Sequence, residues 1–173
     1  MPHFELLKTL LEESICKFYK NDICLLERKG GMVRMERCVV MRIYYYMQRM
    51  LDDDPRFSEL KHYNLDGEYN RNGTDPKRIR QNSKNGDIPD VILHRRLSNA
   101  DNLLIVEFKV RNSTEPRNQN FENDIDKLIC ATSKDGEFRF FLGVSVVLTP
   151  KDKNLRYFQC GKETTLAELK CKV

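Results

Sequence analysis

The sequence predicts a single α/β domain in which a mixed central β-sheet carries helices on both faces. Three observations support this fold class. Residues 4–19 and 33–51 carry apolar side chains at helical spacing. Residues 88–94 and 103–110 are short apolar runs of the kind found in buried strands. Residues 121–132 then return to helical spacing before further strand-like segments, so helices and strands alternate along the chain.

Composition narrows the class of protein further. The chain has 173 residues, enough for one domain with a sizeable core, and 40% of them are hydrophobic. With 30 basic and 26 acidic residues the net charge is only +4, which allows a phosphate-binding face but argues against a nonspecific polycation. The six cysteines form no Cys-x-x-Cys pair, and neither a signal peptide nor a membrane-spanning run is visible. We therefore expect reduced thiols, a cytoplasmic location and no membrane partner.

The first part of the chain is predicted to be helical. Residues 1–31 form an N-terminal helical extension whose apolar side chains recur on one face. A second, unusually apolar helix over 33–51 ends at the acidic run before Pro55. Glu36 lies in its first turn, where an acid complements the helix dipole. A purely structural role for Glu36 therefore stays open beside a functional one.

Strands and a polar loop follow. Residues 63–69 alternate between polar and apolar side chains, which predicts a strand. Residues 72–87 contain almost nothing apolar and form a long loop, whose cations include Lys77, Arg78 and Arg80. Such a loop is either simply solvated or contacts a phosphate backbone.

The segment 103–110 is the most strand-like stretch, yet it carries two charges near its end. Because strand side chains alternate, Glu107 and Lys109 leave the same face while Phe108 points to the other. Burying ions is costly unless they are paired or coordinated, so these charges need a partner. A hairpin between 88–94 and 103–110 would bring Asp90 to the same edge.

The remaining elements complete a mixed sheet. They are a helix over 121–132, a strand over 137–148, a last strand over 155–160 and a short helix over 164–171. We assign 33–148 as the core of the domain and 149–173 as a C-terminal strand and helix.

Three features together resemble the PD-(D/E)XK nuclease superfamily, which has the restriction-endonuclease-like fold. They are Pro89-Asp90, then Glu107-Phe108-Lys109, and an upstream helix bearing Glu36. Short sequence motifs are also similar to those of an uncharacterised bacterial branch of that superfamily. They include Glu68-Tyr69-Asn70-Arg71 and the run Asp90-Val91-Ile92-Leu93-His94. Asp124 and Lys127 on the following helix fit the same pattern, whereas Ile88 replaces the arginine usual before the proline. The similarity covers residues 33–148.

This resemblance implies a metal-dependent endonuclease or exonuclease acting on DNA or, less readily, on RNA. Asp90, Glu107 and the Phe108 carbonyl would hold Mg²⁺, for which Mn²⁺ would substitute, because hard cations prefer oxygen ligands. Lys109 would orient or deprotonate the attacking water and stabilise the charged transition state. Glu36 would support the ion's hydration shell or a second ion.

Substrate contacts are expected from a wider set of polar and basic residues, namely Glu68, Tyr69, Asn70, Arg71, Lys77, Arg78, Arg80, Arg95 and Arg96. Other hypotheses stay open. The alternative to the enzyme is a noncatalytic nucleic-acid-binding or assembly module, with Glu107 and Lys109 as a buried ion pair, but the intact set of two acids and a lysine favours the enzyme. Glu68 would then be a surface acid. His94 is expected to be a hydrogen-bonded structural histidine, and a homodimer is a hypothesis that cutting both strands would suggest.

Overall fold

The computed structural model describes residues 2–27, 35–72, 75–80, 86–99, 101–111 and 119–170. A six-stranded sheet runs through this part of the chain in the spatial order β1-β2-β3-β4-β5-β6. β3 and β4 are parallel, and every other neighbouring pair is antiparallel. The strands are β1 (Asn64–Gly67), β2 (Val91–His94), β3 (Asn102–Val110), β4 (Leu142–Leu148), β5 (Lys153–Gln159) and β6 (Lys162–Thr164).

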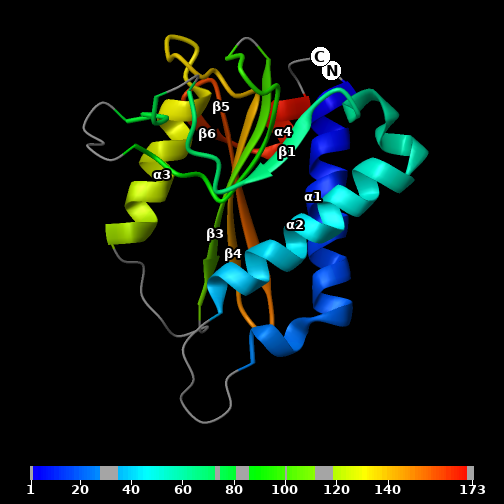
Figure 1. Ribbon diagram of the computed structural model, residues 1–173. Coiled ribbons are helices and arrows are strands. Elements are labelled where there is room, and N and C mark those ends of the chain that lie inside the picture. Colours follow the sequence, from blue (N-terminus) through cyan, green and yellow to red (C-terminus); the bar gives the residue numbers. More distant parts are fainter. Residues whose placement is uncertain are drawn as a thin grey trace.

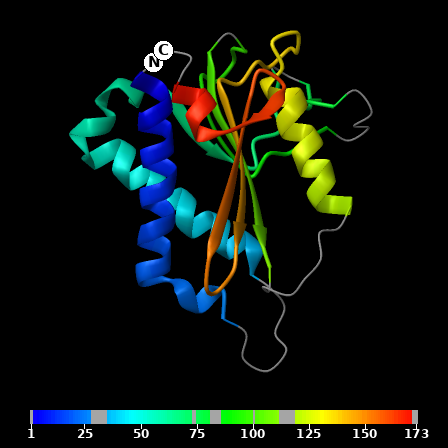
Figure 2. The ribbon, with the colours of Figure 1, turned by 180° about the vertical axis from the view of Figure 1, so that it is seen from behind.

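Helices cover both faces of this sheet. The α-helices are α1 (Pro2–Asn21), α2 (Glu36–Asp53), α3 (Gln119–Thr132) and α4 (Leu166–Lys170), and short 3₁₀ helices span Ile23–Leu25 and Pro55–Leu60. α1 and α2 lie together on one side of the strands, and α3 lies on the other (Figure 1). The view from behind shows α1 crossing α2 while α3 remains on the opposite side (Figure 2). The mixed α/β fold class predicted from the sequence is confirmed.

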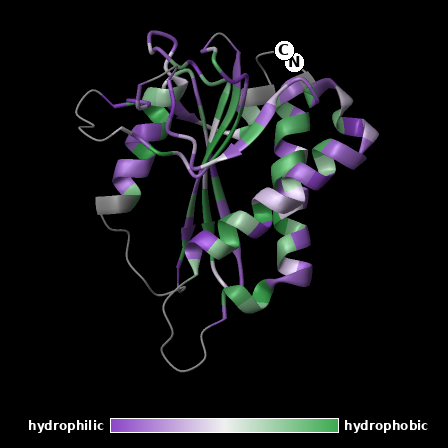
Figure 3. Cartoon of the chain, in the orientation of Figure 1, coloured by the Kyte–Doolittle hydropathy of each residue, from purple (hydrophilic) through white to green (hydrophobic). Residues whose placement is uncertain are grey.

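Two hydrophobic cores follow from the alternation of side chains along β3. Val106 and Phe108 point into the larger core, which α1 and α2 close. Ile105 points the other way, into a smaller core shared with α3 and with Phe138 and Phe140. Figure 3 shows the apolar colouring concentrated on the central strands and on the inner sides of the helices. β3 is therefore covered on both faces, as its sequence predicts.

The connections between the strands determine which elements lie beside the charged end of β3. β2 and β3 form the predicted antiparallel hairpin, with Val91 opposite Val106. The chain then passes through α3 before β4 returns parallel to β3, since parallel neighbours need a crossover. α3 consequently lies against the face of β3 from which Glu107 and Lys109 project.

Several predicted boundaries are wrong by a few residues. The second helix begins at Glu36, because Met35 has non-helical backbone angles; residues 33 and 34 lie outside the described part of the chain. The strand predicted from 137 begins only at Leu142. The apolar run misled the prediction because Phe138 and Phe140 are buried in the smaller core without joining a strand ladder.

The C-terminal part contains one strand more than predicted. β6 pairs antiparallel with β5 after a turn at Cys160 and Gly161, both of which have positive φ. Its three residues are too few to show a period of two, which explains why the sequence does not reveal it.

The helix α1 is part of the main core. Leu7, Leu10 and Ile15 are fully buried there. The Tyr157 hydroxyl on β5 donates to Glu12 Oε1 at 2.9 Å, and the Tyr19 hydroxyl donates to the Thr149 carbonyl at 2.8 Å. Residues 2–21 therefore share their core with the sheet. None of the helices in the described ranges is both long and apolar enough to cross a membrane.

Candidate active site at the end of β3

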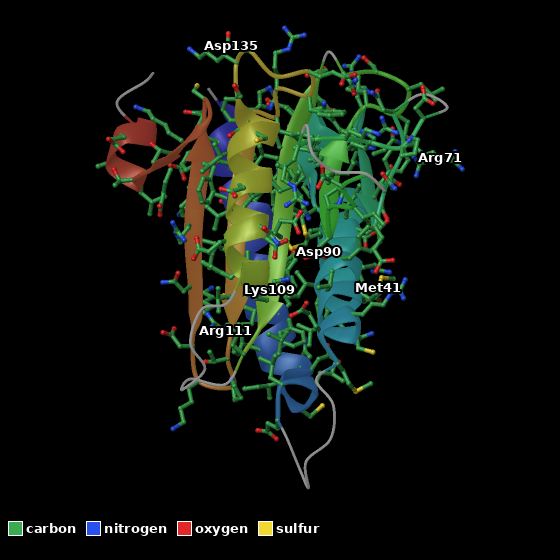
Figure 4. All side chains as sticks on the ribbon, turned by 90° about the vertical axis from the view of Figure 1, so that its left-hand side faces the viewer. Met41, Arg71, Asp90, Lys109, Arg111 and Asp135 are labelled. Atoms are coloured by element: carbon green, nitrogen blue, oxygen red, sulfur yellow. The ribbon has the colours of Figure 1, made fainter. Side chains whose placement is uncertain are left out.

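Acidic and basic side chains from four segments meet where β3 approaches its end. β3 supplies Glu107 and Lys109, the residue before β2 supplies Asp90, α2 supplies Glu36, and α3 supplies Asp124 and Lys127. Asp90 and Lys109 lie between α3 and α2 in Figure 4. We call these six side chains the carboxylate–lysine cluster. The sequence prediction that Asp90, Glu107 and Lys109 lie close together is confirmed.

Asp90 is fixed by the backbone of the neighbouring strand. Its Oδ2 accepts a hydrogen bond of 2.7 Å from the Phe108 backbone N–H. Its own carbonyl accepts one of 3.1 Å from the N–H of Glu68, which has a positive φ. Burial raises the pKa of Asp90, although the Phe108 N–H and the nearby lysines oppose this shift. The carboxylate is thus held in place by one oxygen.

Glu107 is the most deeply buried acid of the cluster, with 3% of its surface exposed. Lys127 Nζ on α3 lies 2.9 Å from Glu107 Oε1 and 3.5 Å from Asp124 Oδ1. Burial raises the pKa of Glu107 well above its usual range, and Lys127 opposes the shift only in part. Lys127 also donates to the Ile88 carbonyl at 3.3 Å, which fixes its ammonium group at the base of the cluster.

Lys109 and Glu36 form the more exposed side of the cluster. Lys109 Nζ lies 2.8 Å from Asp124 Oδ2 and 3.7 Å from Glu36 Oε1. Burial alone would lower the pKa of Lys109, but the carboxylates of Asp124, Glu36 and Asp90 outweigh it and raise that pKa. Glu36 Oε2 also accepts a 2.8 Å hydrogen bond from the Val110 N–H, which ties the start of α2 to β3.

The cluster carries more negative than positive charge. Four carboxylates face two ammonium groups, a formal excess of two negative charges when all are ionised. Desolvation makes that excess unfavourable, which is why the pKa values of Asp90 and Glu107 are raised. A bound divalent cation would supply the missing positive charge and lower both values.

Two oxygen atoms of the cluster fit a hard cation. Glu107 Oε1 and Asp124 Oδ2 are buried and have no hydrogen-bond partner of acceptable geometry, although each is close to a lysine. Both oxygens are ion-paired with those lysines, and carboxylate oxygens are also the ligands that a hard divalent cation prefers. Across the described residues, no three acidic, histidine or cysteine side chains converge as a ready ligand set, because lysines lie between the acids.

A small cavity opens beside Asp90. It has a volume of about 130 Å³ and lies between the first two turns of α2 and the end of β1. Glu36 and Asp90 form its acidic wall, Val40 and Met41 its apolar wall, and Arg37 pairs with Glu68 Oε2 at 2.5 Å across its mouth. Any ligand of Asp90 on this side would therefore contact α2 directly.

The main difference between the observed and the predicted site is the presence of Asp124 and Lys127. The sequence places both on the helix after β3, yet assigns them no role. Their spacing of three residues puts them on one face of α3. The sequence did hold a signal for this role, because the buried charges of Glu107 and Lys109 each required a partner of opposite charge. An acid and a lysine on the next helix could supply both partners.

The predicted substrate contacts are dispersed over the upper part of the molecule. Arg80 pairs with buried Asp87 at 2.7 Å. Arg95 lies 3.1 Å from Asp101 Oδ2, and Arg96 pairs with Asp66. Arg78 is exposed. Three of these cations are therefore engaged with acids, and their contacts with a phosphate backbone stay predictions.

The other predicted contacts fall into two places. Glu68 borders the cavity beside Asp90. Tyr69 and Arg71 line a separate pocket, and Asn70 Oδ1 accepts the Lys77 backbone N–H at 2.9 Å. Lys77 is only 1% exposed, so the prediction of a loop with nothing to bury is wrong at this residue. His94 is buried and bonded to Asp66 at 3.0 Å, as the structural interpretation predicts.

Comparisons with known proteins found no relative of this chain. No protein-family model, curated protein or solved structure matches the chain. The six-stranded mixed sheet with helices defines a mixed α/β protein. The finer resemblance to PD-(D/E)XK nucleases stays a prediction.

Proposed function

We propose that the protein is a metal-dependent nuclease that hydrolyses phosphodiester bonds of DNA or, less readily, of RNA. The observation that carries this proposal is the carboxylate–lysine cluster, in which four carboxylates face two ammonium groups in a partly buried position at the end of β3. A wholly structural cluster would be expected to balance its charges. The restriction-endonuclease-like fold and the Mg²⁺ cofactor belong to the same proposal.

Asp90 and Glu107 are the proposed ligands, with the Phe108 carbonyl as a further oxygen. Mg²⁺ bound there would neutralise phosphate charge and activate a water molecule. Lys109 Nζ, the more exposed of the two ammonium groups, would orient that water and stabilise the developing charge. Glu36, which is held by the Val110 N–H, would position water on the side of α2.

Asp124 and Lys127 take positioning roles in this proposal. Asp124 lies between both lysines and holds Lys109 at 2.8 Å, so it sets the direction of that ammonium group. Lys127 pairs with Glu107 and would have to yield that carboxylate, at least in part, to a bound ion. Metal binding would therefore shift α3 side chains without requiring the strands to move.

One observation favours a second candidate function. Both lysines are already paired with acids, a closed arrangement that a noncatalytic nucleic-acid-binding or assembly module would also retain. In that case the buried structural ion pair would be Glu107 with Lys127; the predicted pairing of Glu107 with Lys109 is wrong, because Lys109 pairs with Asp124. Binding of nucleic acid would then depend on salt but not on metal.

Metal binding is the first test because it requires no substrate. We would titrate Mn²⁺ and Mg²⁺ by calorimetry into the protein and into Asp90→Asn, which keeps the acceptor for the Phe108 N–H but removes the charge. The proposal predicts saturable binding that weakens more than about tenfold in the variant, since even the outer residues of metal sites contribute that much.

The matched control is Asp135→Asn, an exposed acid distant from Asp90 in Figure 4. It should bind metal as the native protein does. Cleavage of single- and double-stranded DNA and RNA would follow under the same conditions, with Glu107→Gln and Lys109→Met expected to be inactive but folded. Absence of metal binding in the native protein would reject the metal-dependent nuclease, and full cleavage activity in Lys109→Met would reject the carboxylate–lysine cluster as its active site.

A further inference from the structure

A second polar pocket lies at the opposite end of β2 from Asp90. It has a volume of about 210 Å³ and is lined by Tyr69, Arg71, Asn72, Lys77, His94, Leu97, Ser98 and Asn99. Its mouth is open, because Arg71, Leu97 and Ser98 are exposed. Arg71 and Asp90 are clearly separated in Figure 4, so this pocket is distinct from the carboxylate–lysine cluster.

Lys77 forms part of the wall and is almost completely buried, with 1% of its surface exposed. Its Nζ lies 5.5 Å from the ring centroid of Tyr69, 5.1 Å from that of Phe138 and 5.4 Å from that of Phe140. Three aromatic faces attract the ammonium group, yet they do not replace an anionic partner.

The acids nearest to Lys77 are engaged elsewhere. Asp66 pairs with Arg96 and with His94. Glu137 Oε1 accepts a 2.7 Å hydrogen bond from Asn72 Nδ2. In the described part of the chain neither acid forms an ion pair with Lys77, although both act on its charge from a distance. A buried cation without a counter-ion is costly, which favours an anion from outside.

The backbone around Lys77 holds it in this position. The Asp87 N–H donates to the Lys77 carbonyl at 2.6 Å, and Gly86 has a φ of +82°. A Cβ atom at residue 86 would lie 2.9 Å from Asn70 Oδ1 and 3.0 Å from the Lys77 carbonyl, so glycine is required there. Lys77 is consequently a fixed part of the pocket wall.

We propose that this pocket binds a phosphate group, with Lys77 as the buried counter-ion and Arg71 at the mouth. Two cations line this one pocket, and a phosphate dianion carries the two negative charges that would balance them. The amides of Asn72 and Asn99 also line it, held by hydrogen bonds from Asn72 Nδ2 to Glu137 Oε1 and from Asn99 Nδ2 to Asn72 Oδ1. The group would come from free phosphate, a mononucleotide or the end of a polynucleotide. The proposal stands independently of the metal centre; if the protein is a nuclease, the pocket would bind a terminal phosphate of its substrate.

Protonation provides a second readout. Burial lowers the pKa of Lys77 to about 8, while Asp66 and Glu137 oppose this shift. A bound dianion would stabilise the protonated amine, so binding near pH 8 should be accompanied by proton uptake. Above that pH the affinity for phosphate should fall, because the free amine must first take up a proton.

The test is a calorimetric titration of inorganic phosphate in the presence of a chelator, using the native protein, Lys77→Met and Arg71→Ala. Lys77→Met keeps an unbranched apolar side chain against the rings. We expect saturable binding that weakens about 10- to 100-fold in Lys77→Met and by less in Arg71→Ala. Arg71 is exposed, so its variant keeps the test valid if Lys77→Met fails to fold.

Further arms separate the sources of the phosphate group. A 5′-phosphorylated and a 3′-phosphorylated oligonucleotide are compared with the same unphosphorylated strand, and acetate is the carboxylate control. Asp90→Asn should bind phosphate normally, which distinguishes failure here from failure of the proposed nuclease. Equal phosphate affinity in native protein and both pocket variants, or no saturable phosphate binding to native protein, would overturn the proposal.

Discussion

Among the residues that the structure describes, two lysines are buried in opposite surroundings. Lys127 is 7% exposed and lies among carboxylates, which outweigh desolvation and raise its pKa. Lys77 is 1% exposed and lies among aromatic rings, where burial lowers its pKa to about 8. Burial alone therefore does not determine the charge of a lysine. The neighbouring groups decide whether the ammonium ion is a stable structural partner or a cation that still lacks one.

Removal of the charge from Lys127 should give the largest effect on stability. Lys127→Met leaves Glu107 buried without its counter-ion, which should lower the free energy of unfolding by about 3–5 kcal/mol near pH 8. The deficit should shrink at lower pH, because Glu107 then takes up a proton. Urea unfolding of the native protein and the variant at several pH values measures it.

The double variant Glu107→Gln with Lys127→Met is the matched control, since it removes both charges. It should recover much of the lost stability. If the single variant were as stable as the native protein, Lys127 would not be the partner that keeps Glu107 charged, and the contrast with Lys77 would disappear.

Lys77 should show the opposite pH dependence. In the unfolded chain the lysine keeps its proton up to its ordinary pKa of 10.5, whereas in the folded protein burial lowers this pKa to about 8. Stability linked to this group therefore rises with pH between these two values, by roughly 3 kcal/mol in total. Lys77→Met has no such proton to lose, so its free energy of unfolding does not change with this titration. The difference in free energy of unfolding between the variant and the native protein should therefore shift by that amount, in favour of the native protein, from pH 7 to pH 10.5.

Denaturant unfolding at successive pH values compares the native protein with Lys77→Met and with Lys61→Met, an exposed lysine. The free energy of unfolding of Lys61→Met should change with pH in the same way as that of the native protein between pH 8 and pH 10.5. Parallel curves for all three proteins would show that Lys77 keeps an ordinary pKa, and the proposed phosphate pocket would lose its proton-linked readout.

Lys109 provides the intermediate case and the smallest stability effect. Its side chain is 25% exposed, and Asp124 retains Lys127 when Lys109 is removed. Lys109→Met should therefore change the free energy of unfolding by about 1 kcal/mol or less, measured by urea denaturation. A loss comparable to that of Lys127→Met would mean that the two lysines form one inseparable network.

The long elements of this fold were predictable because their sequence patterns are local. Helical spacing gives α1 and α2 within a few residues, and β3 is revealed by its apolar run. The hairpin then places Asp90 beside Phe108 by register alone. The short strand β6 has no such pattern.

The partners of the charged residues were harder to predict because they arise from tertiary packing. Lys127 reaches Glu107 only because α3 returns across that face of β3. Lys77 lies in a polar stretch, yet Phe138 and Phe140, about 60 residues later, enclose it. No local signal in residues 72–87 indicates that this lysine is buried.

The contact between α1 and β5 has a consequence for biosynthesis. Glu12 and Tyr157, which are hydrogen-bonded, are separated by 145 residues. At typical translation speeds the ribosome needs on the order of ten seconds to make the intervening chain. α1 can pair with α2 during that time, but the apolar side that faces the sheet must wait for β4 and β5. The native core therefore closes only late in synthesis.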